Sequence, residues 1–367
     1  MPPLSASSQP SAAPSGQLEA LLTRAWSRRG PLACALWPLS IVFRALSGVR
    51  RLLYRRGWLH STRLGVPVIV VGNIFIGGTG KTPLTIWLVA ALQQAGFHPG
   101  VISRGHGSAD TGHADHGPRL VMPTSTAQQV GDEPLLIAQR SRCPVMVGRD
   151  RVAAGKALLE QHPEIDIVIS DDGLQHYALQ RDIEIVLFDA RATGNGWLLP
   201  AGPLREAGNR RRDFTVLNAP QLTPGLVARV AGPDPDSAVI QMQLVGEFAE
   251  RLSDRSELIG LPLLAQSSQR IVAAAGIGNP GRFFALLKAQ GLQFAELPLP
   301  DHHAFLDRPF AAIDADVILI TEKDAVKCRQ IEELKDDPRL WVVPVSARID
   351  AALAQHIVEK CRGCSTA

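Results

Sequence analysis

The stretch "VGNIFIGGTGKTP", residues 71–83, decides the fold. Its first two residues are the end of a continuous apolar run, "VPVIVVG" (66–72), and its last four are the start of a segment of helical character, 80–95. A buried strand, a glycine-rich loop ending in Lys-Thr and a helix, in that order, form a phosphate-binding loop. Its glycines let backbone N–H groups turn toward the phosphates, and the helix N-terminus adds its dipole. The stretch therefore predicts a nucleotide site.

The start of this loop departs from the usual form. In G-x-x-x-x-G-K-[ST] a glycine stands five residues before the second glycine, and that place holds Phe75. In the related form K-G-G-x-G-K-T, used by partition-type and membrane-positioning ATPases, a lysine precedes the double glycine, and that place holds Ile76. We expect Lys81 to reach the β- and γ-phosphates and Thr82 to ligate Mg²⁺. The predicted nucleotide-binding residues are Gly77, Gly78, Thr79, Gly80, Lys81 and Thr82.

A phosphate-binding loop needs an acidic partner for its metal at the end of a buried strand. "IDIVISDDGLQH" (165–176) places Asp171 and Asp172 directly after such a strand. By position Asp171 is the predicted Mg²⁺ partner, and Asp172 is a candidate for a second ion or for the water shell of the first. The alternative is an ordinary strand-end turn, because Asp-Gly pairs are common there.

The rest of the chain alternates strands with helices. Apolar runs at 165–170 and 183–190 imply a parallel sheet covered by helices on both faces. A second set follows, with strands at 270–277, 316–321 and 340–347 and a helix at 280–290. We predict an α/β fold with two α/β/α P-loop-NTPase-like units joined by an extended linker, and a cleft between them for a two-substrate reaction. The predicted boundaries are 66–223 for the phosphate-loop domain, 224–269 for the linker and 270–367 for the second α/β domain with its C-terminal helix.

The basic charge of the chain is concentrated at its N-terminus. Residues 1–65 hold nine arginines, no lysine and one acidic residue, Glu19, a net charge of +8, whereas the whole chain carries +3. Within this part, 1–16 is rich in Pro, Ser and Ala and is predicted to be a disordered tail rather than a signal peptide. Segment 17–65 is predicted to associate with a membrane, because its positive charge would attract an anionic lipid surface.

Residues 31–56, "PLACALWPLSIVFRALSGVRRLLYRR", carry the membrane prediction. Pro38 and Arg44 interrupt the apolar run, so we expect no bilayer span and a helix opened by Pro38. At about 100° per residue the helix separates two faces, a basic one with Arg44, Arg51 and Arg55 and an apolar one with Leu39, Phe43, Leu46 and Leu53. Such an amphipathic helix lies in a membrane interface, with its arginines toward anionic lipid. The alternative is a helix packed on the protein's own core with a solvated basic face.

Two further patterns predict no metal or redox centre. The five cysteines are scattered and odd in number, which favours a reducing cytosol, and Cys361 and Cys364 form a single C-x-x-C pair without a second one. His113, Asp115 and His116 have metal-like spacing but lie in a Gly-rich polar loop.

Seven motifs make a resemblance specific. They occur in this order: GNIFIGGTGKTP, SRGHG (103–107), VGDEP (130–134), DDGLQH (171–176), LLPAGPLRE (198–206), DHHAF (301–305) and TEKDAVK (321–327). Together they resemble the tetraacyldisaccharide 4′-kinase family of the lipid A pathway of Gram-negative bacteria, over about residues 30–330. That family has the same unusual loop start, and His106 stands where its motif has tyrosine.

The resemblance implies transfer of the γ-phosphate of ATP to the 4′-hydroxyl of a tetraacylated glucosamine disaccharide 1-phosphate. It implies ATP and Mg²⁺ as cofactors, the lipid disaccharide and the anionic inner-membrane surface as partners, and a peripheral or monotopic place on the cytoplasmic face of that membrane. We predict no nucleic-acid partner, and the sequence predicts no particular oligomeric state.

This reaction needs a group that accepts the hydroxyl proton. We predict Asp132 as the base and His302 as its partner, since an Asp–His pair holds the base in orientation and shares the proton. The resemblance supports both positions, and His303 is the rival for the histidine role. The alternative for Asp132 is an N-cap of the helix that begins at "EPLLIAQR" (133–140).

Arg104, His176 and Arg205 are candidates for binding phosphate or sugar, because an arginine fork suits a phosphate. The alternatives are surface ion pairs for the arginines and a packed polar residue under the Asp171 turn for His176. Glu322, Lys323 and Asp324 match the family motif without an assigned role.

Two other functions remain open from the residues. One is a partition-type nucleotide switch that docks on membranes through its helix, against which Ile76 argues. The other is a soluble kinase for a small metabolite, with the N-terminal helix packed internally.

Overall fold

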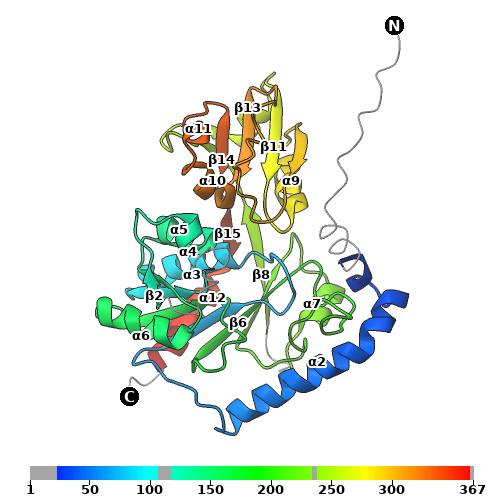
Figure 1. Ribbon diagram of the computed structural model, residues 1–367, viewed down its shortest axis with the longest axis vertical. Helices are drawn as coiled ribbons and strands as arrows, with labels where there is room; N and C mark the ends of the chain where they lie inside the picture. Colours follow the sequence, from blue (N-terminus) through cyan, green and yellow to red (C-terminus); the bar gives the residue numbers. More distant parts are fainter. Residues whose placement is uncertain (1–22, 106–116, 234–237, 364–367) are drawn as a thin grey trace.

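The computed structural model in Figure 1 describes residues 23–105, 117–233 and 238–363. It contains two α/β/α units stacked along the long axis of the molecule, so the predicted fold class is confirmed. The expected disordered tail lies outside the described residues, as do His106, His113, Asp115, His116 and Cys364.

The first unit is built on a nine-stranded sheet with the order β15-β8-β7-β6-β1-β5-β2-β4-β3. Its strands are parallel except β3 and β15, which pair antiparallel at the two edges. The strands are β1 (Val68–Gly72), β2 (Pro99–Ser103), β3 (Arg119–Leu120), β4 (Val145–Val147), β5 (Ile167–Asp171), β6 (Ile183–Asp189), β7 (Phe214–Asn218), β8 (Val239–Val245) and β15 (Ser346–Ile349).

Helices cover both faces of this sheet, which explains why its central strands are continuously apolar. One face packs against α3 (Lys81–Gln94), α5 (Asp132–Ser141) and α12 (Ala351–Gly363). The other face packs against α6 (Arg151–Gln161) and α7 (Pro224–Val230). A short helix, α4 (Ala127–Val130), precedes α5.

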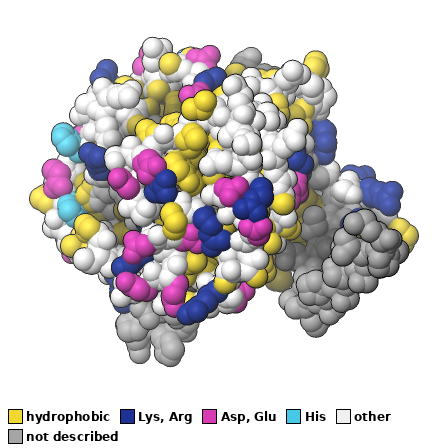
Figure 2. Space-filling view, turned by 90° about the horizontal axis from the view of Figure 1, so that it is seen from above, with side chains coloured by type: hydrophobic (Ala, Val, Ile, Leu, Met, Phe, Trp, Pro, Cys, Tyr) yellow, Lys and Arg dark blue, Asp and Glu magenta, His cyan; other side chains and the backbone are white. Residues whose placement is uncertain are grey.

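The second unit has a six-stranded sheet with the order β10-β9-β14-β13-β11-β12. Its strands are β9 (Phe248–Arg251), β10 (Leu258–Gly260), β11 (Ile271–Ala275), β12 (Ala295–Pro298), β13 (Val317–Thr321) and β14 (Leu340–Val343). One face packs against α8 (Leu261–Ala265) and α9 (Pro280–Ala289), and the other against α10 (Glu322–Cys328) and α11 (Glu332–Lys335). Figure 2, seen from above, shows acidic and basic side chains interspersed on the face in view.

The boundaries between the units differ from the prediction. Segment 224–269 is not a linker outside the sheets: it holds α7 and β8 of the first unit and β9, β10 and α8 of the second. The C-terminal part of the predicted second domain returns to the first unit, because β15 pairs with β8 and Leu353 and Ile357 of α12 pack in the core beside α3. The antiparallel pair β8 and β15 therefore carries the chain between the units in both directions.

The N-terminal helix also differs from the prediction. It runs without interruption as α2 (Pro31–Arg55), with Pro31 in its first turn and Pro38 inside it, so Pro38 does not open it. By length and composition alone α2 is long enough to cross a membrane, and 11% of its most apolar window is buried. Figure 1 shows α2 along the side of the first unit, and its apolar face includes Leu46, which is 66% exposed.

Candidate active site

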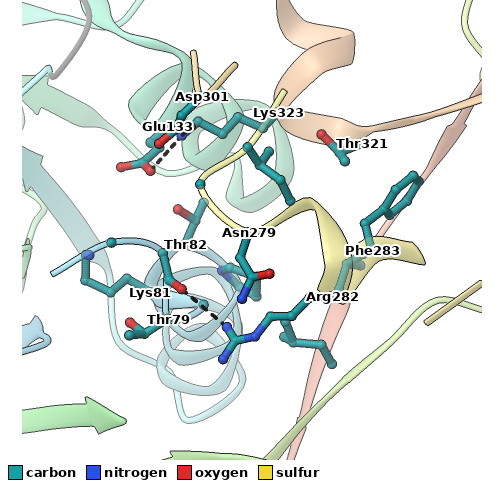
Figure 3. Close-up of a pocket in the computed structure, with 18 of the residues that line it drawn as sticks. Thr79, Lys81, Thr82, Glu133, Asn279, Arg282, Phe283, Asp301, Thr321 and Lys323 are labelled. Carbon is teal, nitrogen blue, oxygen red and sulfur yellow. Dashed lines mark hydrogen bonds and ion pairs between the residues drawn. The ribbon is translucent and has the colours of Figure 1, made fainter. Parts of the chain in front are cut away.

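A cavity of about 410 Å³ opens between the two units. The first unit lines it with residues 76–83 of the phosphate loop, and the second unit with residues from 277–286 and 321–323 and with Asp301 and His302. Figure 3 shows Lys81, Thr82 and Thr79 facing Asn279, Arg282 and Lys323 across it. The nucleotide loop and the second unit thus share one site.

The phosphate loop has the local geometry that the sequence predicted. Gly80 stands at the N-cap of α3 with φ +104°, and a Cβ there would lie 2.8 Å from Asn218 Nδ2, so only glycine fits. Lys81 and Thr82 follow in the first turn of α3 and line the cavity. The hydroxyl of Thr79 is buried and has no hydrogen-bond partner among the described residues, which suits a site that receives phosphate oxygens.

The unusual start of the loop has a structural reason. Residues 74–76 lie extended beside residues 203–205, with Ile76 N donating to Pro203 O at 3.0 Å and Arg205 N donating to Ile74 O at 2.7 Å. Phe75 forms an antiparallel β-bridge with Leu204, and its side chain is only 6% exposed and packs in the core of the first unit. The first half of the loop is therefore held by pairing with the "PLR" segment, and a glycine is not needed at position 75.

Lys81 belongs to a polar network that sequence reasoning missed. Its Nζ donates to Asn73 Oδ1 at 3.2 Å and lies 3.8 Å from Asp172 Oδ1. Arg205 donates to Asn73 O at 3.0 Å and to Asp172 Oδ1 at 3.2 Å. Asn73 is fully buried directly after β1, and its sequence signals are its position at a strand end and its place in the GNIFIGGTGKTP motif. The network holds two cations and one carboxylate at the mouth of the phosphate loop.

The two predicted metal ligands differ in their surroundings. Asp171 is buried at the end of β5, where it accepts hydrogen bonds from Thr85 Oγ1 at 3.1 Å and Ser103 Oγ at 3.4 Å. Burial raises the pKa of Asp171 to about 7, and the nearby Glu133 adds to the rise. Asp172 lines the cavity itself. These carboxylates and the Thr82 hydroxyl are oxygen donors, which Mg²⁺ prefers, and a buried carboxylate lacking full charge compensation fits a cation site.

Asp132 and His302 meet across the two units. His302 Nδ1 lies 3.0 Å from Asp132 Oδ2, and because a carboxylate only accepts, the ring nitrogen carries the proton. His302 lines the cavity, whereas Asp132 lies behind it and is 4% exposed. His303 is turned elsewhere: its Nε2 lies 3.2 Å from Asp307 Oδ2. The geometry pairs Asp132 with His302 and not with its rival.

Asp132 does not cap α5 as the alternative supposed. The helix begins at Asp132 with Gly131 as the N-cap, and Asp132 Oδ1 accepts only from the neighbouring N–H of Glu133 at 3.0 Å. Its other oxygen is left for His302.

Charges around the pair adjust both members. Burial by itself would raise the pKa of Asp132, but the hydrogen bond with His302 and the charges of Lys323 and Lys327 hold it below its ordinary value. The same hydrogen bond raises the pKa of His302 above its ordinary value, against the effects of burial and Lys323. The carboxylate is therefore ionised at neutral pH, and the imidazole holds a proton more firmly than a free histidine.

The TEKDAVK motif now has a structural account. Lys323 Nζ donates to His302 Nε2 at 3.5 Å and to Glu133 Oε1 at 3.2 Å, so it joins the pair to the cavity wall. Glu322 accepts from Arg140 and from Val345 N, which ties α10 to α5 and to the connection between β14 and β15. Asp324 is fully buried and accepts from Gly276 N at 3.0 Å. Lys323 therefore faces the cavity, whereas Glu322 and Asp324 fix α10 to the elements around it.

The three predicted substrate residues are not all at the cavity. Arg205 lines it, and Arg104 and His176 do not. Burial and the charges of Arg151 and Arg104 lower the pKa of His176 to about 4, so it is neutral and lies beside those arginines. Arg151, which the sequence analysis did not single out, is 1% exposed.

Helix α2 contacts the segment that pairs with the phosphate loop. Ser40 Oγ donates to Leu198 O at 2.7 Å, and the rings of Trp37 and Trp197 lie with their centroids 6.4 Å apart and their planes tilted by 48°. Near the helix end, Arg51 lies 3.9 Å from Glu206. The helix is thus packed on one side and exposes apolar side chains on the other.

Comparison with known proteins agrees with this geometry. A family model described as tetraacyldisaccharide-1-P 4′-kinase matches residues 32–362. Proteins named tetraacyldisaccharide 4′-kinase are similar in Janthinobacterium sp. (strain Marseille), 62% identical over 95% of this chain and 98% of the relative, and in Herminiimonas arsenicoxydans, 61% identical over the same shares. The crystal structure of the "apo" form of LpxK from Aquifex aeolicus in complex with ATP matches with a TM-score of 0.72 and 27% identity, over 90% of this chain and 99% of that one. This chain therefore belongs to the tetraacyldisaccharide-1-P 4′-kinase family.

Proposed function

We propose that this protein transfers the γ-phosphate of ATP to the 4′-hydroxyl of tetraacyldisaccharide 1-phosphate in lipid A synthesis. The observation that carries the proposal is the single cavity that joins a complete phosphate loop to the Asp132–His302 pair. A partition-type switch has no need of such a pair, and the family membership agrees with a kinase.

The side chains at the cavity divide the work of phosphoryl transfer. The phosphate loop binds the nucleotide through its backbone N–H groups, and Lys81 supplies a positive charge at the β- and γ-phosphates. Thr82 and the carboxylates of Asp171 and Asp172 are the residues that would hold Mg²⁺, which neutralises phosphate charge when bound. Arg205, fixed by Asn73 and Asp172, is placed to contact a phosphate oxygen.

The Asp132–His302 pair takes up the proton of the acceptor hydroxyl. The bond from the γ-phosphorus to the bridging oxygen breaks as the bond to the 4′-oxygen forms, and the proton passes to the pair. Asp132 carries the negative charge, and His302 is the member that borders the cavity. Lys323 accepts no proton but holds His302 Nε2 and Glu133 in place.

We further propose that α2 associates with the cytoplasmic surface of the inner membrane. Its exposed apolar side chains suit the acyl layer and its arginines suit anionic headgroups. A lipid acceptor would then meet the cavity of an enzyme already bound to its membrane.

The direct test is a phosphotransfer assay with labelled ATP and purified tetraacyldisaccharide 1-phosphate in detergent. We expect a product that carries the label at the 4′-position and a rate that depends on the amphiphile. Equal labelling of a small soluble sugar, independent of any amphiphile, would support the soluble-kinase alternative.

The pH dependence follows from the coupled pair. The pair accepts the substrate proton most readily when Asp132 is ionised and His302 is neutral. Because the pKa of His302 is raised above its usual value near 6.5, a larger share of the pair is already protonated at neutral pH. We expect kcat to rise with pH through this raised pKa and to fall as the pH drops below it. A His302→Gln variant should lose this dependence, and a profile unchanged by the substitution would contradict the assignment.

The two faces of α2 can be separated by a matched pair of variants. Ser40→Val removes one hydrogen bond to Leu198 O, which keeps its hydrogen bond from Gly202 N at 2.9 Å, so the loss costs about 0.5–1.5 kcal/mol. We expect a lower unfolding temperature with membrane association intact. Leu46→Ser, on the exposed face, should keep stability and weaken cosedimentation with anionic vesicles. Equal effects of the two variants on both readouts would show that α2 has no separate membrane face.

A further inference from the structure

The second unit contacts the phosphate loop at one corner, formed by Gly78. A Cβ placed on Gly278 would lie 3.6 Å from Gly78 N, so the two backbones approach closely. Arg282, in the first turn of α9, donates from its Nη1 to Gly78 O at 3.3 Å. Figure 3 shows the Arg282 side chain reaching from the second unit to the loop, at the edge of the cavity.

Arg282 is held in place by a carboxylate of the first unit. Its Nη2 lies 2.7 Å from Asp189 Oδ2, at the end of β6. Arg191 binds the same carboxylate and also donates to Gly78 O at 3.2 Å. Asp189 therefore has a second cation when Arg282 moves away, so Arg282 can change partner without leaving a buried charge unpaired.

The same corner lacks a charge that a related loop provides. In K-G-G-x-G-K-T the extra lysine stands at the position of Ile76, which is apolar here and borders the cavity. In this chain two arginines reach Gly78 O, two residues further on: Arg191 from the first unit and Arg282 from the second. The contribution of Arg282 to the charge at the corner thus depends on the two units being together.

We propose that Arg282 is a catalytic residue that binds the transferred phosphoryl group of ATP, in a role that rests on the proposed kinase function. Its guanidinium forms no covalent bond in the step. It neutralises the charge that develops on the phosphoryl oxygens, as arginines supplied by a second domain or protein do in other phosphoryl-transfer enzymes. The fork of N–H groups matches two phosphate oxygens at once, which an ammonium group does not.

The test compares Arg282→Ala and Arg282→Lys with Lys288→Ala. Lys288 is an exposed lysine on the same helix and pairs with Glu296. Its substitution removes one positive charge, as in Arg282→Ala, but at a side chain that does not contact the phosphate loop. We expect Arg282→Ala to lower kcat about 10³-fold, with the dissociation constant of ATP changed less than about threefold. Arg282→Lys should recover little, added guanidinium should restore part of the rate of Arg282→Ala, and Lys288→Ala should behave as wild type.

A structural role would give a different pattern. The proposal is overturned if Arg282→Ala keeps its kcat, or if its loss of rate is matched by a lower unfolding temperature and guanidinium restores nothing. The slow hydrolysis of ATP without acceptor is measured in parallel. If wild type fails to label the lipid yet hydrolyses ATP with the same dependence on Arg282, the acceptor assignment fails and the role of Arg282 stands.

Discussion

A Lys81→Ala variant is expected to lose about 10³-fold or more of its kcat, the scale on which a preorganised charge acts on a transferred phosphoryl group. Lys81 is held at the mouth of the loop by Asn73 and Asp172, and its side chain is 13% exposed. Arg205, the other cation of this network, is occupied by the same two partners. No flexible replacement for the lost charge stands among the described residues of this network.

The measurement is kcat at saturating ATP, with the unfolding temperature as a check on folding. Lys156→Ala is the matched control, because Lys156 is exposed on α6 and does not line the cavity. A Lys81→Ala variant with the rate of wild type would refute the assignment of the loop, whereas loss of rate in both variants would point to a general charge effect.

An Asp132→Asn variant is expected to lower kcat by about 10²–10⁴, the usual range for loss of a general base. Asparagine keeps the size of the side chain but removes the charge that raises the pKa of His302. Since Asp132 does not line the cavity or contact the phosphate loop, ATP should bind as in wild type. Single-turnover rates and nucleotide titration separate the two effects.

His302→Gln should resemble Asp132→Asn, and the double variant should lose little more than either single one, because the two residues act as a unit. His303→Gln is the control: it changes the neighbouring histidine, which faces Asp307. If ATP affinity collapsed in Asp132→Asn, or if His303→Gln were the more damaging histidine variant, the pair would not be the proton acceptor.

The parts of the site that the sequence predicted are local. A strand, glycines and Lys-Thr at the start of a helix place their own backbone and side chains within a few residues, so Gly80, Lys81 and Thr82 were found from their order alone. Asp171 and Asp172 were found for the same reason, as residues that end a buried strand. The pairing of Asp132 with His302, 170 positions apart, came from a family resemblance, because no local pattern brings them together.

The errors come from contacts distant in sequence. Strand β15 and helix α12 were assigned to the second domain because they follow it in the chain, whereas hydrogen bonds to β8 and packing beside α3 place them in the first. The sequence predicts that Pro38 begins a helix, because proline is favoured in the first turn. The structure shows that the helix starts earlier, at Pro31, and that Pro38 lies inside it. Arg282 lies in none of the seven motifs, and Asn73 lies in one of them, but its contact with Lys81 and Arg205 is not visible in the sequence.

The sequence by itself determined the chemistry that each short segment can perform: a loop that binds phosphate, carboxylates that suit a metal, and an amphipathic helix rich in arginine. Periodicity and backbone preference act within a few residues, so these properties survive without knowledge of the fold. Only the tertiary structure decided which segments share a site. It joined "PLR" to the start of the phosphate loop within the first unit, and His302 to Asp132 and Arg282 to Gly78 between the two units. These contacts join segments far apart in the chain, and the order of segments along the chain does not reveal their neighbours in space.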